Sequence, residues 1–123
     1  MKKLAVFLSF LFVVSCSKDD VCNTNPALSP PTISDISYSS IKISGSVKGK
    51  ACDTGVISKG IVVSKEELPS INSNVIRINI SDDSFQKIIE TLETNTQYFV
   101  RTFLVNNDGE FYSSQTSFNT LNE

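Results

Sequence analysis

The chain carries one cysteine in a setting where its thiol can be used for covalent attachment. Cys16 follows a small residue, Ser15, at the end of an apolar run over residues 4–14, and two lysines precede that run. A positive start, an apolar segment and a small residue at the cut site are typical of an export signal, and this segment is too short to span a bilayer. We therefore expect residues 1–15 to be removed as a signal peptide, which makes Cys16 the first residue of the exported protein.

The run Val13-Val14-Ser15-Cys16 resembles the lipobox of bacterial lipoproteins. This resemblance implies that the Cys16 thiol receives a diacylglycerol and that the freed amine is then acylated. Two or more acyl chains hold a protein stably on a membrane, because each buried methylene contributes roughly 0.8 kcal/mol. The alternatives are a short membrane helix, or an ordinary secretory signal with a chance cysteine.

The residues after Cys16 bear on which membrane holds the anchor. Ser17 follows the cysteine, so the Asp-based inner-membrane retention signal of some enteric bacteria is absent. Residues 17–20 (Ser-Lys-Asp-Asp) resemble the acidic tag that carries lipoproteins of another Gram-negative group to the cell surface. Two aspartates that only solvate a tether are the alternative. We expect a lipid-anchored protein of the outer membrane, exposed at the cell surface.

Lipidation of Cys16 leaves Cys22 and Cys52, and the compartment beyond the inner membrane permits disulfide bonds. One pair is then available, and closing that loop would stabilise the fold by roughly 3 to 4 kcal/mol. The alternative is two free thiols. No metal site is expected, because the chain has no histidine and the two cysteines lack the paired spacing of a zinc site.

Length and charge limit the classes of function. The chain has 123 residues and a formal net charge of −2, and loss of the leader removes two lysines and no acid, which gives −4. A nucleic-acid partner is not expected, because a phosphate-binding surface needs a basic patch. The length after cleavage fits one domain and a tether.

Side chains suited to catalysis are few. Without histidine, the Ser-His-Asp and Cys-His arrangements are lacking, so we predict that the protein is not an enzyme and uses no cofactor. The adjacent carboxylates Glu66-Glu67 and Asp82-Asp83 would point to opposite faces of a strand. A calcium site built from Asp82, Asp83 or Asp108 is the alternative, since Ca²⁺ needs only oxygen ligands, although the ordered spacing of a calcium loop is missing.

The segment 16–30 is predicted to be a flexible tether that begins with the lipidated cysteine and is rich in Ser, Asp, Asn, Thr and Pro. After it, apolar residues recur with a period of two, which is typical of strands. Seven such segments cover residues 33–38, 41–48, 57–63, 75–80, 85–92, 96–105 and 111–120. The segment 85–92 also has weak helical spacing, so a short helix is the alternative there. Short strands separated by frequent turn signals predict a two-sheet sandwich.

The strand that begins near residue 96 carries a recognisable motif. Leu92, Thr96, Tyr98 and Val100 occur in the order Leu, three residues, Thr, one residue, Tyr, one residue, Val. This order resembles the E-F corner of fibronectin type III domains. The resemblance implies an all-β, seven-stranded immunoglobulin-like (fibronectin type III-like) β-sandwich over residues 31–121. It also implies a tyrosine corner, in which the Tyr98 hydroxyl bonds to backbone near Leu92.

The same resemblance has consequences for the two cysteines and for orientation. In such a sandwich the first strand begins at the pole that holds the B-C and F-G loops, so the tether and Cys52 would lie close together. A bond between Cys22 and Cys52 would then pin the tether to the membrane-side pole. The E-F loop and the C-terminus would face outward.

Alternation along the same strand predicts a binding face. If Tyr98 and its inward neighbours face the core, then Phe99, Arg101 and Phe103 point outward, where two rings and a guanidinium can bind a protein or a glycan. The alternative is that these side chains stabilise the sheet by cross-strand pairing. The sequence thus predicts a non-catalytic binding or adhesion module, and the alternative is a periplasm-facing structural accessory lipoprotein of an outer-membrane assembly.

Overall fold

The computed structural model describes residues 25–49 and 55–123, which form nine β-strands and no helix that could cross a membrane. The strands are β1 (Ala27–Leu28), β2 (Thr32–Ser34), β3 (Ile41–Lys48), β4 (Ser58–Ser64), β5 (Asn74–Ile78), β6 (Ser84–Ile89), β7 (Gln97–Asn106), β8 (Gly109–Tyr112) and β9 (Thr116–Asn119). The predicted leader over residues 1–15, the lipidation site Cys16 and the cysteines Cys22 and Cys52 lie outside the described residues.

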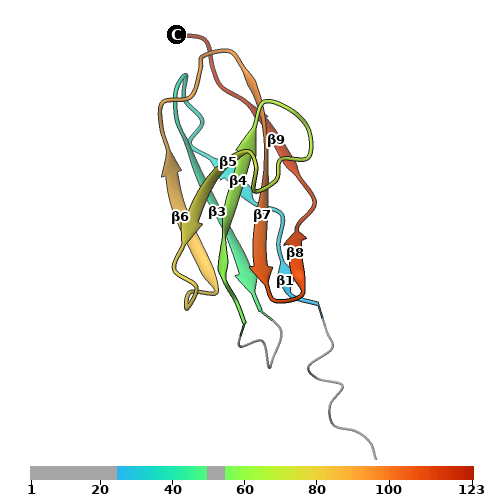
Figure 1. Cartoon of the computed structure of the whole chain (residues 1–123). Helices are drawn as coiled ribbons and strands as arrows, with labels where there is room; N and C mark the ends of the chain where they lie inside the picture. Colours follow the sequence, from blue (N-terminus) through green and yellow to red (C-terminus); the bar gives the residue numbers. More distant parts are fainter. Residues whose placement is uncertain (1–24, 50–54) are drawn as a thin grey trace, which may run out of the picture.

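The strands form two antiparallel sheets that pack face to face (Figure 1). In the first sheet β1, β2 and β6 all pair with β3, and in the second the order is β5-β4-β7-β8, with β9 also paired to β7. β5 and β6, which follow one another in the sequence, each pair with a single strand of a different sheet. The edges of the two sheets therefore adjoin along one side of the sandwich.

The structure has nine strands in its described residues, where the sequence predicts seven, because the first and the last strand are each divided in two. β1 and β2 lie in succession along the edge of β3 opposite β6, and the break between them holds Pro30 and Pro31, which have no amide to donate. β8 and β9 lie in the same way along the edge of β7 opposite β4. Since β1 starts at Ala27, the sandwich begins inside the segment predicted to be a tether, and β2 ends at Ser34 where the prediction continued to residue 38.

The core lies between the sheets and follows the period-two pattern. Alternate residues of β3, β4 and β7 are buried there together with residues of β6 and β9: Ile41, Ile43, Ile61, Val63, Ile89, Tyr98, Val100 and Phe118. Burying each large aliphatic side chain contributes about 1.5–3 kcal/mol. The period-two apolar residues thus supply the contact that holds the sheets together.

The ambiguous segment 85–92 is a strand rather than a helix over most of its length. β6 pairs with β3 from Ser84↔Ser46 to Ile89↔Ile41, and Ile89 is buried while its neighbour Ile88 is 65% exposed. This alternation is that of a half-buried strand, and it ends before Leu92, which lies in the following loop and packs on the core.

The connection between β4 and β5, residues 65–73, folds over the outer face of the second sheet, and we call it the strap. The Leu68 amide donates to Gln115 Oε1 at 2.7 Å, and the Ile71 amide donates to the Tyr112 hydroxyl at 3.0 Å. Pro69, within the strap, is fully buried. Figure 1 shows the strap beside β7 and β9. Both faces of this sheet are therefore partly covered, the inner one by the core and the outer one by the strap.

Candidate functional site

The corner between β6 and β7 has the hydrogen bonds of a tyrosine corner. Tyr98 is 7% exposed, stacks on Phe118 with ring centroids 5.6 Å apart, and accepts the Glu93 amide through its hydroxyl at 2.9 Å. The Thr96 amide donates to Thr120 Oγ1 at 2.9 Å. Leu92 packs against the core. The motif residues therefore fasten the loop after β6 to the last strand.

The predicted binding face is not a free aromatic surface. Phe103 is fully buried, with 0% exposure, so it cannot contact a ligand from outside, and this part of the prediction is wrong. In the sheet register Phe103 lies between Gly60 of β4 and Tyr112 of β8. A Cβ added at Gly60 would collide with the Ile76 carbonyl oxygen, so glycine at this position allows the backbone of β5 to approach closely.

Arg101 is engaged in contacts inside the protein. Its Nε donates to the Ser113 carbonyl at 3.1 Å, and its guanidinium carbon lies 4.2 Å from the centroid of the Tyr112 ring. A cation over an aromatic face is stabilising by about 0.5–1 kcal/mol at partly exposed sites. Phe99 and Arg101 are both half-buried. The three residues thus lie on one face, as predicted, and the contacts of Arg101 and the burial of Phe103 fit the cross-strand alternative.

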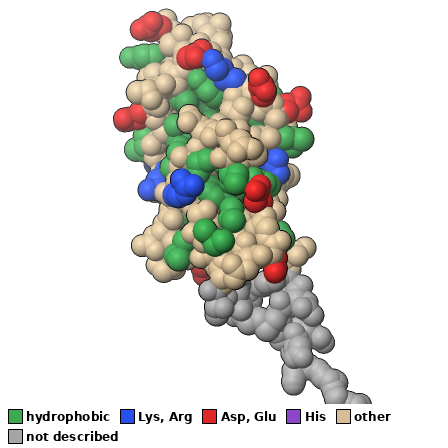
Figure 2. Space-filling view, viewed as in Figure 1, with side chains coloured by type: hydrophobic (Ala, Val, Ile, Leu, Met, Phe, Trp, Pro, Cys, Tyr) green, Lys and Arg blue, Asp and Glu red, His purple; other side chains and the backbone are tan. Residues whose placement is uncertain are grey.

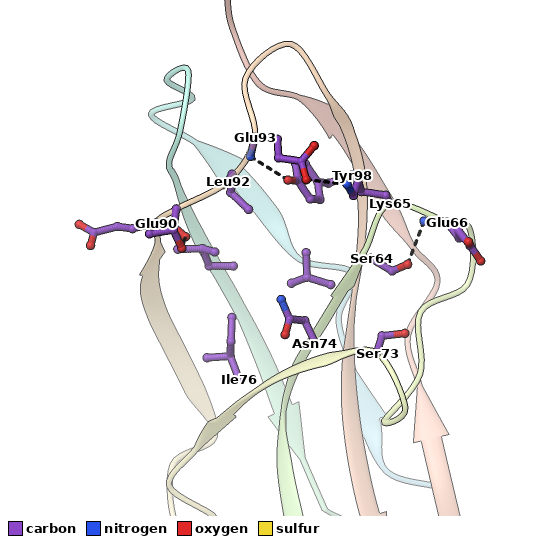
Figure 3. A pocket seen from close by; sticks show the side chains of 13 residues that line it. Ser64, Lys65, Glu66, Ser73, Asn74, Ile76, Glu90, Leu92, Glu93 and Tyr98 are labelled. Carbon is purple, nitrogen blue, oxygen red and sulfur yellow. Dashed lines mark hydrogen bonds and ion pairs between the residues drawn. The ribbon is translucent and has the colours of Figure 1, made fainter.

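A cleft of about 520 Å³ opens elsewhere, between the two sheets beside the tyrosine corner (Figure 3). It lies where β5 begins and β6 ends, on the side of the sandwich where the sheet edges adjoin. Its residues come from the end of β4, the start of the strap, β5, the end of β6 and the corner: Val63, Ser64, Lys65, Glu66, Ser73, Asn74, Ile76, Ile89, Glu90, Thr91, Leu92, Glu93 and Tyr98. Its volume is within the range of small-ligand sites.

The cleft has an apolar floor and a charged rim. Val63, Ile89 and Tyr98 are buried at the floor, and Ile76 and Leu92 are half-buried. Figure 3 shows Leu92 and Asn74 pointing into the opening. In the space-filling view, apolar side chains lie along the middle of this face of the molecule, with charged side chains on either side (Figure 2).

The rim is predominantly acidic. Lys65 Nζ lies 2.6 Å from Glu93 Oε2, and this hydrogen bond raises the pKa of Lys65 above its ordinary value of 10.5. Glu66, in the strap, and Glu90, directly after β6, are exposed on opposite sides of the opening (Figure 3). The rim therefore carries three carboxylates and one lysine, and it attracts positive charge.

The backbone is strained at one point of this rim. Thr91 has φ = 61°, in the left-handed region that β-branched residues avoid, and its hydroxyl donates to the Glu90 carbonyl. Such a conformation costs about 1–3 kcal/mol and persists only where the surroundings hold it. The corner bonds of Tyr98 and Thr96 hold this loop on its C-terminal side.

The carboxylates considered for calcium do not gather. Within residues 25–49 and 55–123, no group of three or more His, Cys, Asp or Glu residues is placed to hold a metal ion. An Asp83 carboxylate oxygen instead lies 3.7 Å from Nζ of Lys59, and Asp83 directly precedes β6, whose other end borders the cleft. The calcium alternative therefore has no support in the described part of the chain.

No pattern in the sequence indicated the cleft. Its walls come from segments that lie well apart along the chain, and no spacing rule relates residues 63–66 to residues 89–93. The acidic residues around the Leu92 motif were the one available signal, and by composition they resemble any solvated loop.

No protein-family model matches the sequence, and no curated protein matches it. Among solved structures, the sensor domain of the anti-sigma factor RsgI4 from Pseudobacteroides cellulosolvens is similar, with a TM-score of 0.63 and 21% identity over 82% of this chain and 99% of that one. A fibronectin type III domain of human fibronectin type III domain containing protein 3 has a TM-score of 0.56 at 16% identity, over 82% and 91% of the chains. A fibronectin type III domain of human collagen XX has a TM-score of 0.54 at 18% identity, over 86% and 100%. These likenesses confirm the predicted fold class: the chain forms an all-β, two-sheet sandwich of the fibronectin type III-like kind.

Proposed function

We propose that this protein is a lipid-anchored protein of the bacterial cell envelope that presents one sandwich domain as a non-catalytic binding module at the cell surface. The observation that carries the proposal is the placement of the cleft relative to β1, the first described strand. β1 lies at one pole, beside the turn between β7 and β8, and the cleft opens toward the other pole, where the C-terminus lies (Figure 1). An anchor at Cys16 would leave the cleft facing away from the membrane.

Two further points support a binding role without catalysis. The similar solved structures are described as fibronectin type III domains and as a sensor domain, and we extend to this chain only the general role of a recognition module. The sequence has no histidine to serve as general base. The cleft is accordingly a site for holding a ligand, with Glu66, Glu90 and Glu93 as its acidic groups.

The second candidate is a periplasm-facing structural accessory lipoprotein of an outer-membrane assembly. The contacts of Arg101 and Phe103 favour it, because the aromatic face suited to an external ligand is used to hold the second sheet together. The two candidates differ in the side of the membrane on which the domain lies.

Protease treatment of intact cells distinguishes them. The domain is followed by antibody in the wild type, in a Cys16→Ala variant and beside a known periplasmic protein. Loss of the wild-type signal alone supports surface display. Protection of the wild type under conditions in which lysed cells are digested supports the periplasmic alternative. Mass measurement of the N-terminal peptide tests lipidation of Cys16 directly.

We also propose a disulfide bond between Cys22 and Cys52, which would pin the tether near the pole that holds β1. Mass spectrometry of the folded protein with and without reductant tests it, with alkylation before unfolding. A protein mass that is two units lower before reduction than after it, together with no alkylation of either cysteine, supports the bond. Alkylation of both thiols in the unreduced folded protein contradicts it.

A further inference from the structure

We propose that the cleft binds an extended segment of a partner protein, which pairs with the free edge of β5, places apolar side chains in the cleft and sets basic side chains against its glutamates. This inference rests on the proposed binding function and assigns the ligand class of the same site. It depends on three features of the cleft: a free strand edge, an apolar floor and an acidic rim.

The free edge belongs to β5. In the described part of the chain, β5 pairs only with β4, so the backbone groups on its other side are open to a further strand. An exposed edge of this kind accepts an extended peptide by β-augmentation, in which main-chain hydrogen bonds supply affinity. β5 reads Asn-Val-Ile-Arg-Ile, so it has no proline and one charged residue, Arg77, which lies on the outer face and leaves the inward positions Ile76 and Ile78 apolar.

The apolar floor lies where the side chains of such a segment would go. A strand added to β5 would extend the second sheet toward β6 and cover the cleft. Every second side chain of that strand would point inward, toward Ile76, Ile89 and Leu92. These contacts would remove apolar surface from water at about 25 cal/mol per Å². The segment is therefore expected to carry aliphatic residues at alternate positions.

The rim determines the charge of the segment. Glu93 is already paired with Lys65, and within residues 25–49 and 55–123 no basic side chain lies within ion-pair distance of Glu66 or Glu90. These two carboxylates stand on either side of the opening (Figure 3). Lysine or arginine residues alternating with the aliphatic ones would reach them. Charge complementarity of this kind adds mainly to specificity and to the association rate.

A glycan is a poorer match for the cleft. Sugars are commonly bound by stacking on an exposed aromatic ring, and among the described residues Tyr98 is the one aromatic residue that lines the cleft. Its ring is 7% exposed and already stacks on Phe118. The cleft thus offers an open strand edge and no aromatic surface, which favours a polypeptide.

The test uses the full lipidated chain in detergent and fluorescein-labelled eight-residue peptides. The probe is a peptide in which valine and lysine alternate. One control peptide has glutamate in place of lysine, and the other has the sequence of the probe with N-methyl groups on its backbone. Affinity is measured by fluorescence polarisation, and the contact site by NMR chemical-shift changes. We expect the valine-lysine peptide to bind at least tenfold more tightly than either control, with the largest shifts at β5 and the cleft.

The variant Glu66→Lys/Glu90→Lys tests the rim, and Glu67→Lys/Asp82→Lys is the control with the same change of charge. All four side chains are exposed, so both variants should fold. The first should weaken binding of the valine-lysine peptide at least tenfold, and the second less than threefold.

Several results would overturn the assignment. They are an absence of binding at millimolar peptide, equal binding of the valine-glutamate or N-methylated peptide, shifts centred away from β5, and equal effects of the two variants. Displacement of the peptide by soluble oligosaccharides would also contradict it, in favour of a glycan. Failure of surface display in the protease assay leaves these measurements unaffected, so the two proposals fail separately.

Discussion

The hydroxyl of Tyr98 accepts a hydrogen bond from the backbone amide of Glu93, with 2.9 Å between the two heavy atoms. This bond joins a buried ring of β7 to the loop that forms the upper wall of the cleft. The carboxylate of the same Glu93 pairs with Lys65 across the opening. The corner that stabilises the sandwich therefore also positions the rim of the candidate site.

Removing this hydroxyl should destabilise the protein. In Tyr98→Phe the Glu93 amide loses its acceptor while the ring stays in place, so we expect the free energy of unfolding to fall by about 1–3 kcal/mol. Urea denaturation followed by circular dichroism measures it. The half-exposed Tyr38 provides the control, since Tyr38→Phe should change stability by less than about 0.5 kcal/mol. Equal effects of the two changes would contradict a stabilising corner.

The burial of Phe103 predicts a contrast with Phe99 on the same face. Phe103→Ala should cost about 3–5 kcal/mol, because it leaves a cavity between neighbouring strands. Phe99 is half-buried, and Phe99→Ala should cost clearly less, about 1–2 kcal/mol. Thermal unfolding of both variants gives the comparison. A small effect of Phe103→Ala would restore the interpretation of this face as a binding surface.

Lys59 is 2% exposed, and its ammonium donates to the Val47 carbonyl at 2.9 Å and lies 3.7 Å from the exposed carboxylate of Asp83. A buried ammonium costs desolvation, so Lys59→Met, which keeps most of the volume, should stay within about 1 kcal/mol of the wild type. Lys59→Ala should cost about 2–4 kcal/mol through lost packing.

Asp83→Asn should have little effect, because Asp83 is 64% exposed. If the Met variant is as unstable as the Ala variant, the charge and not the volume determines stability here.

The strap makes Tyr112 sensitive to high pH. Burial raises the pKa of Tyr112 above its ordinary value of 10.0, although the amide of Ile71 that bonds to the hydroxyl acts in the opposite direction. The folded state therefore favours the neutral phenol. This stabilisation is fully present below pH 10 and is lost as the pH rises through the folded-state pKa.

Ultraviolet absorbance of the phenolate measures this titration. The difference between the wild type and Tyr112→Phe gives the curve of Tyr112 alone, and its midpoint should lie above 10. In the same range of pH, stability should fall more steeply in the wild type than in Tyr112→Phe. A midpoint at or below 10 would mean that the hydrogen bond from Ile71 outweighs burial.

The class of the fold could be predicted from local patterns because each acts over a few residues. The alternation in Ile41, Ile43 and Val47 sets which face of β3 is buried, and the same holds along β7. The order of Leu92, Thr96 and Tyr98 marks the corner for a similar reason, since the hydroxyl reaches backbone only five residues away. The interruptions of the first and last strands escaped prediction for two reasons. β1 has only two residues, too few to show a period. In the last strand Tyr112 pairs with Phe103 on the outer face and Phe118 pairs with Tyr98 on the inner face, so the break reverses the alternation.

The inward and outward positions of strand β7 show where the same pattern fails. Alternation places Phe103 on the outer face correctly, but exposure depends on what lies over that face. The strap, held through Gln115 and Tyr112, comes from another part of the chain. An alternation with a period of two predicts which face of the sheet a side chain lies on. It does not predict which other segments of the chain pack over that face.

The sequence by itself determined the all-β sandwich and the residues of the tyrosine corner, since each depends on neighbours within one short segment. It also predicts the leader with its cysteine, for the same reason. Only the tertiary structure decided that Phe103 is buried, that Lys59 lies inside the sandwich, and that a cleft with an acidic rim lies beside β5. These features arise where segments distant in sequence meet. Their geometry depends on how the two sheets pack against each other, which no local period encodes.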